Sequence, residues 1–266
     1  MNLLNHSSPS ASNRRIASPI PILLNMADQV NTMMTISLAT VDDVPILVQV
    51  HTSAFKSDMF SNLMLLNRPE NMHQNLMRKS IDYWLSDPKS QIIKAELDGR
   101  IVGWACWVLK EVDNSQIKKE DPSPAPKQVR KEDPLPAPKE VQKETQSTPQ
   151  DPSRVLGGIM HKEMVYWEDE LLKGKGEKYM ILQALATDPT SQGRGVGTQL
   201  VQWGADKADA DSLVCWAHAS PSGHGLYKRV GFKELGKSDF DLAEWAPGGK
   251  GGNRGWVSVF IPLVGC

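Results

Sequence analysis

Three glycines stand within five residues at the point where an apolar run is about to become a helix. The segment is SQGRGVGTQL, residues 191–200, and its glycines are Gly193, Gly195 and Gly197. Glycine weakens the start of a helix, so its repeated use here indicates a loop whose backbone approaches a ligand closely. The N-terminus of a helix offers unpaired N–H groups and a partial positive charge, which together bind phosphate. The segment therefore predicts a phosphate-binding loop.

Two common phosphate loops do not fit this segment. A Walker loop ends in Gly-Lys-Ser/Thr, whereas this chain has GVGT without a lysine. A dinucleotide fingerprint needs G-x-G-x-x-G near the first strand, whereas the glycines here give G-x-G-x-G late in the chain. A plain glycine turn that binds nothing is the remaining alternative.

A third pattern does fit. QGRGVG, residues 192–197, resembles the Q/R-x-x-G-x-G/A motif of the GNAT superfamily of acetyl-CoA-dependent N-acetyltransferases. In that family the motif follows a strand that ends in an x-Pro turn and opens the central helix, and LATDPTSQGRGVGTQLVQWG has that order. LYKRVGF, residues 226–232, resembles the family's L-Y-x-x-x-G-F element, and DGRIVGWA resembles its central hairpin. The similarity covers roughly residues 34–262 apart from a repeat, and it is typical of a fungal-type member that acts on small molecules.

The resemblance implies that acetyl-CoA binds as cosubstrate and that no metal takes part. It implies a strand that pairs its backbone with the pantetheine arm and offers an N–H to the thioester carbonyl. The residues implied in this binding are Leu185, Ala186, Thr187, Gln192, Gly193, Arg194, Gly195, Val196, Gly197, Thr198 and Ser220. Arg194 either adds a positive charge to the loop or is simply solvated. Ser220 stands where the family often has asparagine, so its contact with the pantetheine has a shorter reach.

Tyr227 matches the family tyrosine that lies near the sulfur and is proposed as the general acid. A phenol has an unperturbed pKa of about 10, so it is protonated and can donate at neutral pH. We expect Leu226 and Val230 to face the core and Tyr227 to lie on an adjacent face of the helix. Packing against the cofactor without proton transfer is the alternative role for this ring.

The general base is not evident from the sequence, because strand 179–187 offers Gln183 and no acid. An acidic group before this strand either lines the amine pocket or forms a solvated helix face. It consists of Glu163, Glu168, Asp169 and Glu170. His218 is either a base or proton relay, or a hydrogen-bonded structural histidine. Cys215 stands three residues before it on a strand, so the two side chains point to opposite faces and form no Cys–His pair.

The elements that must position these residues alternate between strands and helices in a way that predicts an α+β domain. Strands are expected over 35–39, on both sides of the Asp98-Gly99 turn, and over 179–187, 212–220, 232–235 and 256–262. A helix is expected after a capping box of Thr40 and Asp43. A second is expected over 63–85, with apolar residues at Met72, Leu76, Ile81 and Leu85. Further helices are expected over 161–174, from the glycine loop to about residue 208, and over 224–231. The resemblance implies the GNAT fold, a mixed and mostly antiparallel sheet that splays between 179–187 and 212–218 and is flanked by helices.

Two parts of the chain differ from the rest in composition. KKEDPSPAPKQV (118–129) is followed at once by RKEDPLPAPKEV (130–141), a 12-residue tandem repeat dense in proline and charge. Such a segment cannot bury a core, so we expect a disordered insertion over 113–153 within a domain of residues 32–266. A functional lid or a docking site for a partner is the alternative role of this insertion.

Residues 1–31 are rich in Ser, Asn and Pro, and we expect a disordered leader rather than a mitochondrial presequence.

The bulk composition is that of a globular protein that stays in solution. Of 266 residues, 40% are hydrophobic and 23% are charged, and the net charge of −1 favours neither nucleic acid nor an anionic membrane as partner. Three widely separated cysteines make neither a disulfide framework nor a metal site, which indicates a reducing, cytoplasmic compartment. No apolar run has the length of a membrane span. The oligomeric state is not evident.

Three functions are compatible with these features. The first is transfer of an acetyl group from acetyl-CoA to a primary amine of a small molecule or secondary metabolite, by direct attack in a ternary complex. The second is acetylation of a protein lysine or N-terminus, which needs a groove for an extended peptide. The third is a non-catalytic acyl-CoA sensor, and the presence of Tyr227 argues against it.

Overall fold

The computed structural model describes residues 33–111, 152–172, 178–245 and 254–262. The chain divides into two units, Met1–Thr32 and Met33–Cys266, and every described element belongs to the second. The expected leader (1–31) and the repeat (118–141) lie outside the described residues. The expectations about them remain predictions.

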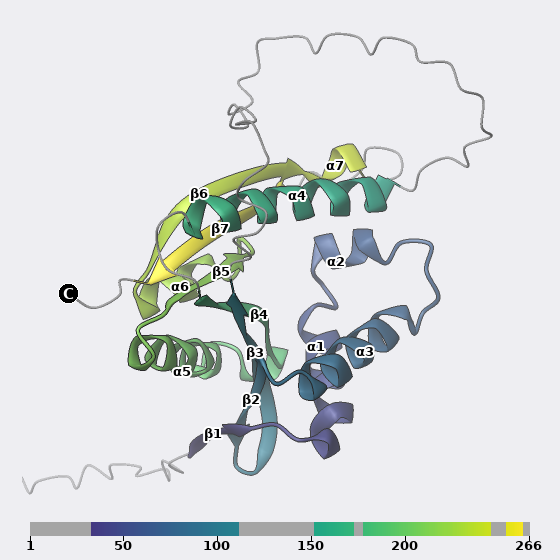
Figure 1. Ribbon diagram of the computed structural model, residues 1–266. Helices are drawn as coiled ribbons and strands as arrows, with labels where there is room; N and C mark the ends of the chain where they lie inside the picture. The colour runs from purple at the N-terminus through teal and green to yellow at the C-terminus, as the bar shows by residue number, and fades with distance from the viewer. Residues whose placement is uncertain (1–32, 112–151, 173–177, 246–253, 263–266) are drawn as a thin grey trace, which may run out of the picture. The chain divides into compact units, whose positions relative to one another are not determined.

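A seven-stranded sheet organises the described part of the chain, with strand order β1-β2-β3-β4-β5-β7-β6 (Figure 1). The strands are β1 (Met34–Leu38), β2 (Ser90–Leu97), β3 (Arg100–Glu111), β4 (Lys178–Thr187), β5 (Val214–Ala219), β6 (Phe232–Asp241) and β7 (Arg254–Pro262). The β4–β5 pair is parallel and the other five described pairs are antiparallel. The prediction of a mixed, mostly antiparallel sheet is therefore confirmed.

The turn between β2 and β3 has the conformation that its sequence predicts. Asp98 has φ of 51° and Gly99 has φ of 74°, and Leu97 lies directly opposite Arg100. Two successive positive φ angles are the mark of a type I′ turn, which suits the twist of a hairpin. This hairpin carries β3 into the middle of the sheet, beside β4.

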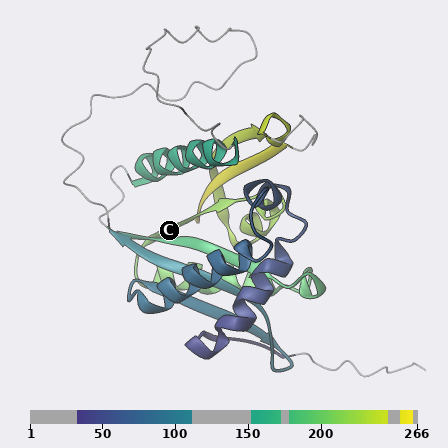
Figure 2. The ribbon, with the colours of Figure 1, turned by 90° about the vertical axis from the view of Figure 1, so that its right-hand side faces the viewer.

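Helices cover both faces of the sheet. Helix α5 (Val196–Ala210) packs on one face, against β2, β3, β4 and β5, whereas α1 (Val44–Ala54) and α3 (Met72–Ser86) pack on the other (Figure 1). Figure 2 shows α1 and α3 crossing in front of the strands. Trp107 and Leu200 are buried in the core under α5, and Trp104 is buried in the core under α1, where its Nε1 donates to the carbonyl of Leu47 at 2.9 Å. The sheet therefore separates two cores.

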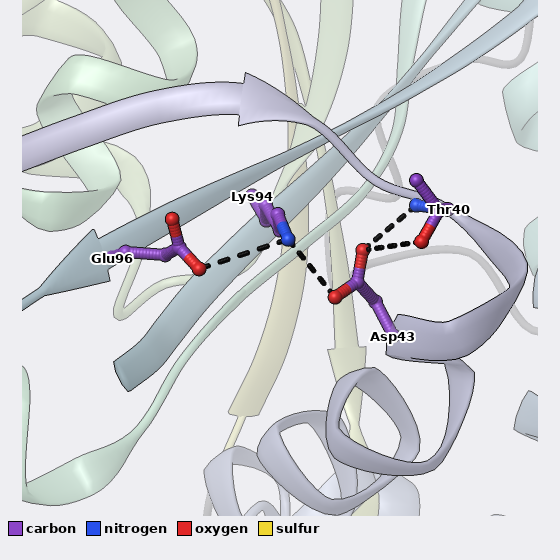
Figure 3. Close-up of polar contacts among 4 residues, drawn as sticks. All are labelled: Thr40, Asp43, Lys94 and Glu96. Carbon is purple, nitrogen blue, oxygen red and sulfur yellow. Dashed lines mark hydrogen bonds and ion pairs between the residues drawn. The ribbon is translucent and has the colours of Figure 1, made fainter. Parts of the chain in front are cut away.

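A small polar network fixes the start of α1 to β2 (Figure 3). Asp43, at the end of the short 3-10 helix η1 (Val41–Asp43), accepts hydrogen bonds from the Thr40 backbone N–H at 2.8 Å and from its hydroxyl at 3.1 Å. Lys94 on β2 donates to Asp43 at 2.9 Å and lies 3.6 Å from Glu96. Burial raises the pKa of Asp43, but the hydrogen bonds from Lys94 and Thr40 outweigh that effect and hold it below its usual value. The predicted helix start at Thr40 and Asp43 is confirmed.

The expected continuous helix over 63–85 is wrong. The chain forms α2 (Met59–Met64) and then α3, and the turn between them contains Asn67 at φ of 59° and Pro69. Proline lacks the N–H that a helix interior requires, so the helical pattern cannot run through it. Leu76, an expected core point, is 52% exposed, whereas Ile81 is fully buried.

The C-terminal part of the sheet is longer than the sequence predicted. Helix α4 (Pro152–Leu172) begins at Pro152, inside the expected insertion, and β6 continues past residue 235 to Asp241, where helix α7 (Leu242–Trp245) follows. A bulge between Glu234 and Gly236 lets β6 continue. A Cβ built on Gly236 would lie only 2.0 Å from a ring carbon of Trp167 on α4. Helix α4 therefore packs directly on β6 at this glycine. Contacts between distant segments therefore determine where α4 begins and where β6 ends.

A pair of histidines joins α1 to α3 in the second core. The Nδ1 of His51 lies 3.1 Å from the Nε2 of His73, and the His51 ring stacks on Phe55 with centroids 4.5 Å apart. Burial first and the nearby His73 second lower the pKa of His51 to about 3. Burial also lowers the pKa of His73. The folded protein therefore holds this pair neutral where free histidine begins to take up protons.

The stability of the protein should fall as the pH drops below about 6.5, the ordinary histidine pKa. The unfolded chain takes up a proton at His51 below that pH, while the folded chain resists it until about pH 3. The stabilisation is thus present above pH 6.5 and is lost through the acidic range, by roughly 2–3 kcal/mol from this group at pH 4.5. Urea unfolding at pH 7 and pH 4.5 measures this loss. His51→Phe should show a smaller difference, and equal differences in both proteins would contradict the prediction.

Candidate active site

The glycine loop joins the end of β4 to the start of α5. Asp188 ends the strand and accepts hydrogen bonds from the Thr190 backbone N–H at 2.9 Å and from its hydroxyl at 2.5 Å, which starts the 3-10 turn η2 (Pro189–Ser191). Gly193 follows with φ of 75° and Gly195 with φ of 84°. A Cβ built on either glycine would meet no atom within 4 Å, so both face open space. These two positions need glycine for backbone conformation, and their surroundings have room for a ligand.

The start of α5 has the features of an anion site. Gly195 is the N-cap residue and has no side chain to bond the first turn, and the first helical bond runs from Gln199 N–H to Gly195 C=O at 3.0 Å. The N–H groups of the three residues between them, 196–198, therefore have no acceptor within the helix. Those groups and the helix dipole favour a negatively charged ligand.

Two other glycines, Gly103 and Gly197, allow neighbouring elements to pack closely around the start of α5. A Cβ on Gly103 of β3 would be 2.6 Å from Val196 Cγ1, so the first turn of α5 lies directly on the strand. A Cβ on Gly197 would be 2.7 Å from Leu226 Cδ1, so helix α6 (His224–Val230) packs as closely on the other side. Sequence reasoning missed Gly103. A glycine inside an apolar strand, as in IVGWA, is the signal for such a close approach.

The two central strands separate beside the loop, as the resemblance implied. β4 pairs with β5 only from Tyr179 opposite Val214 to Leu182 opposite Ala217. β4 then continues to Thr187, and no described β5 residue is its partner there. A bulge between β3 and β4 falls at the same level, where Cys106 faces Ala184, Trp107 faces Leu182 and Gln183 is left over and exposed. The edge of β4 at 183–187 thus has no described strand partner on the β5 side, and we call the region between this free edge and residues 218–219 of β5 the gap.

The structure brings most of the predicted cofactor residues to this gap and loop. Residues 185–187 form the free edge, residues 192–198 form the loop and the first turn of α5, and Ser220 follows β5 directly. Leu185, Thr187, Gly197 and Thr198 are half-buried, Gln192, Gly193, Arg194, Gly195 and Ser220 are exposed, and Ala186 and Val196 are buried. The side chain of Val196 packs under the helix, so it has only its backbone N–H to offer a ligand. The Ser220 hydroxyl lies 3.0 Å from that of Ser222 and accepts from Gly223 N–H at 3.3 Å.

Tyr227 belongs to α6, and its side chain lies in the core on the side of α5. Its ring is 5% exposed and meets Phe232 edge-on, with centroids 5.7 Å apart. Leu226 and Val230 are half-buried and pack against this core, as expected, but Tyr227 is buried more deeply than either. Burial raises the pKa of Tyr227 above its usual value of 10. The phenol is therefore protonated throughout the neutral range.

His218 stands at the head of the gap. It follows the last residue that β5 pairs with β4, and its ring lies edge-on to Trp216 with centroids 4.5 Å apart. Both ring nitrogens are buried, and neither has a hydrogen-bond partner among the described residues. Burial lowers the pKa of His218 to about 4. The hydrogen bond expected of a structural histidine is thus absent from the described contacts.

Cys215 and His218 face opposite sides of the sheet, as predicted. Cys215 belongs to the core under α5, whereas His218 lies with Trp216 on the side of α1. Burial raises the pKa of the Cys215 thiol to about 12, so it is not a thiolate at neutral pH. Cys215 therefore does not supply a thiolate nucleophile to the site.

The acidic residues of α4 are not simply a solvated helix face. Glu168 accepts a hydrogen bond from the Tyr179 hydroxyl, and Glu163 accepts one from Ser238 at 2.8 Å. Burial raises the pKa of Glu168. Asp169 is exposed, and the side chain of Glu170 lies outside the described residues. Tyr179 stands at the paired end of β4, four residues before Gln183, so the Glu168 contact lies away from the gap.

The described residues hold neither a metal-binding cluster nor a membrane-spanning helix. Within residues 33–111, 152–172, 178–245 and 254–262, no three His, Cys, Asp or Glu side chains gather closely enough to hold a metal ion. In the same ranges, no helix combines the length and apolarity that crossing a membrane requires.

Comparisons with known proteins agree with this geometry. Residues 160–234 match the family model described as the acetyltransferase (GNAT) domain. No curated protein matches the chain. Among solved structures, a putative arylalkylamine N-acetyltransferase 7 from the yellow fever mosquito Aedes aegypti is similar, with a TM-score of 0.58 and 14% identity over 87% of this chain and 88% of that one.

Two other solved structures share the same arrangement. The polyamine N-acetyltransferase of Drosophila melanogaster has a TM-score of 0.53 and 12% identity over 86% of this chain and 99% of that one. An agmatine N-acetyltransferase variant has a TM-score of 0.53 and 13% identity over 86% and 98%. At these identities the likeness establishes a common fold.

Proposed function

We propose that this chain, whose residues 160–234 match the GNAT acetyltransferase domain, transfers an acetyl group from acetyl-CoA to the primary amine of a small molecule. The observation that carries the proposal is the free edge of β4 beside an uncapped helix start with two open glycines. This arrangement fits a cosubstrate that has an extended amide-containing arm and a pyrophosphate. The similar solved structures named for arylalkylamines, polyamines and agmatine support an amine acceptor.

Each part of the site has a role in this proposal. The N–H groups of residues 196–198 and the helix dipole bind the pyrophosphate. The backbone of Leu185, Ala186 and Thr187 pairs with the pantetheine arm, and one N–H of this edge polarises the thioester carbonyl. Tyr227 donates its proton to the departing sulfur. The amine attacks directly in a ternary complex, because the described residues at the gap include no thiolate nucleophile.

Acetyl-CoA should stabilise the purified full-length chain. Ligand at about 100 times its dissociation constant adds about 2.7 kcal/mol to the free energy of unfolding. A thermal shift measures this, with ATP as the control because it carries a polyphosphate and an adenine but no pantetheine. Release of CoA with tryptamine, agmatine, spermidine and a lysine peptide then tests transfer. A chain that responds to ATP and not to acetyl-CoA, or that releases CoA with none of the amines, would contradict the proposal.

Gly195→Glu should weaken acetyl-CoA binding by about 10–100-fold, or roughly 1.4–2.7 kcal/mol. The new carboxylate lies at the helix start, where it repels the pyrophosphate. Gly99→Glu is the matched control, because Gly99 also has positive φ and open space and lies in a hairpin turn. The two variants have similar backbone strain, and only the first should lose the acetyl-CoA thermal shift. Equal affinity in both variants would contradict the position of the site. Gly197 is less suitable, because its Cβ also collides with Leu226.

A further inference from the structure

His218 belongs to the face of the gap that lies opposite the phosphate loop. Side chains alternate along β5, so Cys215 and Ala217 face the core under α5, whereas Trp216 and His218 face the side covered by α1. In the proposed function, the cosubstrate approaches from the start of α5. The other face is therefore the direction from which an acceptor can reach the thioester carbonyl, and His218 lies there, level with the exposed Gln183.

The His218 ring is held in place without any polar partner in the described part of the chain. Trp216 meets it edge-on with centroids 4.5 Å apart, and both imidazole nitrogens are buried. Burial alone lowers its pKa to about 4, with no contribution from a neighbouring charge, so the ring is neutral and one nitrogen has a free lone pair. Buried polar atoms without partners are rare in proteins, and they are expected where a ligand supplies the partner.

The two separated segments contain no other candidate for a base. The separated segments 183–187 and 218–219 are QALAT and HA, which contain no carboxylate. Glu168 is hydrogen-bonded to Tyr179 near the opposite end of β4, and Cys215 lies on the other face. His218 is left as the group of suitable chemistry on these two segments.

We propose that His218 accepts the proton that the acceptor amine loses as its nitrogen attacks the thioester carbonyl, an inference that rests on the proposed function. The carbon–nitrogen bond forms and the carbon–sulfur bond breaks. The amine proton passes to the free imidazole nitrogen, and the Tyr227 proton passes to the sulfur. Solvent then takes the proton from the imidazolium and returns one to the tyrosinate, so no oxidant or reductant is needed.

The role has a consequence for the acceptor. A neutral imidazole binds an amine N–H and offers no charge to hold an ammonium ion. The reacting nitrogen is therefore expected to enter the gap uncharged, as an amine on a compact side chain that fits beside Trp216.

His218→Gln and His218→Ala test the proposal in the full-length chain, with whichever of tryptamine, agmatine and spermidine the wild type acetylates. Glutamine keeps a hydrogen-bond acceptor but takes up no proton, so kcat should fall by about 10²–10⁴-fold, while the acetyl-CoA thermal shift is unchanged. Alanine leaves space for an added base. Imidazole should restore activity to His218→Ala, whereas 1,2,4-triazole, which has the same shape and is much less basic, should not. His161→Ala is the control, because it removes an exposed histidine of α4 that lies outside the two separated segments.

The outcomes separate this role from the proposed function. A wild type that acetylates no amine overturns the proposed function and this role with it. An active wild type with His218→Gln within about threefold of its kcat overturns the role of His218 alone. Rescue of His218→Ala by triazole as good as that by imidazole, or rescue by neither, would show that the ring only packs. Rescue that follows the basicity of the added ring supports proton acceptance.

Discussion

Tyr227→Phe should lower kcat by about 10²–10⁴-fold while it leaves acetyl-CoA affinity almost unchanged. Phenylalanine keeps the ring that packs edge-on to Phe232 and removes only the proton donor. Phenylalanine lacks only the hydroxyl, so the ring contacts of this buried residue are kept. Burial holds the pKa above the usual 10, so ionisation of this phenol causes no loss of activity up to about pH 10.

The measurement is kcat under saturating acetyl-CoA with the best acceptor of the amine panel, beside a thermal shift for acetyl-CoA. Tyr83→Phe is the matched control, because Tyr83 is 64% exposed on α3 and its hydroxyl lies outside the site. CoA thiolate is a fairly good leaving group, so transfer without a proton donor is the alternative that this measurement tests. A rate within about threefold of the wild type would reduce Tyr227 to a packing residue.

Gly204→Ala should destabilise the fold by about 1–3 kcal/mol or more. A Cβ at this position of α5 would lie 2.0 Å and 2.3 Å from two ring carbons of Trp107. That ring cannot move aside easily, because it is 1% exposed and its Nε1 donates to the Leu200 carbonyl at 3.3 Å. The helix must therefore lift off β3, and the glycine loop at its start moves with it.

Chemical unfolding of Gly204→Ala beside Gly158→Ala checks this explanation. Gly158 is also inside a helix, α4, but a Cβ there meets nothing within 4 Å. Alanine in an open helical position gains about 0.5–1 kcal/mol over glycine, so this variant should be slightly more stable than the wild type. A Gly204→Ala protein as stable as Gly158→Ala would show that the helix does not need this close approach.

Local rules predicted much of the site. The Asp98-Gly99 turn, the helix start after the glycines and the opposite faces of Cys215 and His218 all depend on residues near one another in sequence, and the structure confirms each of them. Phosphate binding by the glycine loop stays a prediction. The break between α2 and α3 could have been predicted as well, because Pro69 stands inside the expected helix. The cytoplasmic location and the role of the repeat stay predictions.

Contacts between distant segments explain what the sequence did not predict. The burial of Tyr227 depends on how α6 packs against Phe232 and α5, and the length of β6 depends on Trp167 of α4 at Gly236. The absence of a described partner for His218 also depends on which residues other elements bring near it. The helical or strand period of a segment contains no information about such neighbours.

The two edges of β4 serve different purposes. On one edge, Lys178 lies directly opposite Glu111 of β3, although residues 112–177, 66 in all, separate them in sequence. Closing such a loop costs about 3 kcal/mol more than closing a two-residue turn, so strand pairing and not a tight turn sets the register here. On the other edge, pairing stops at Leu182. The same strand thus joins the two sequence blocks of the domain along one side and leaves backbone groups without a described strand partner along the other. An insertion between the blocks can therefore change without altering the edge where we propose that the cosubstrate binds.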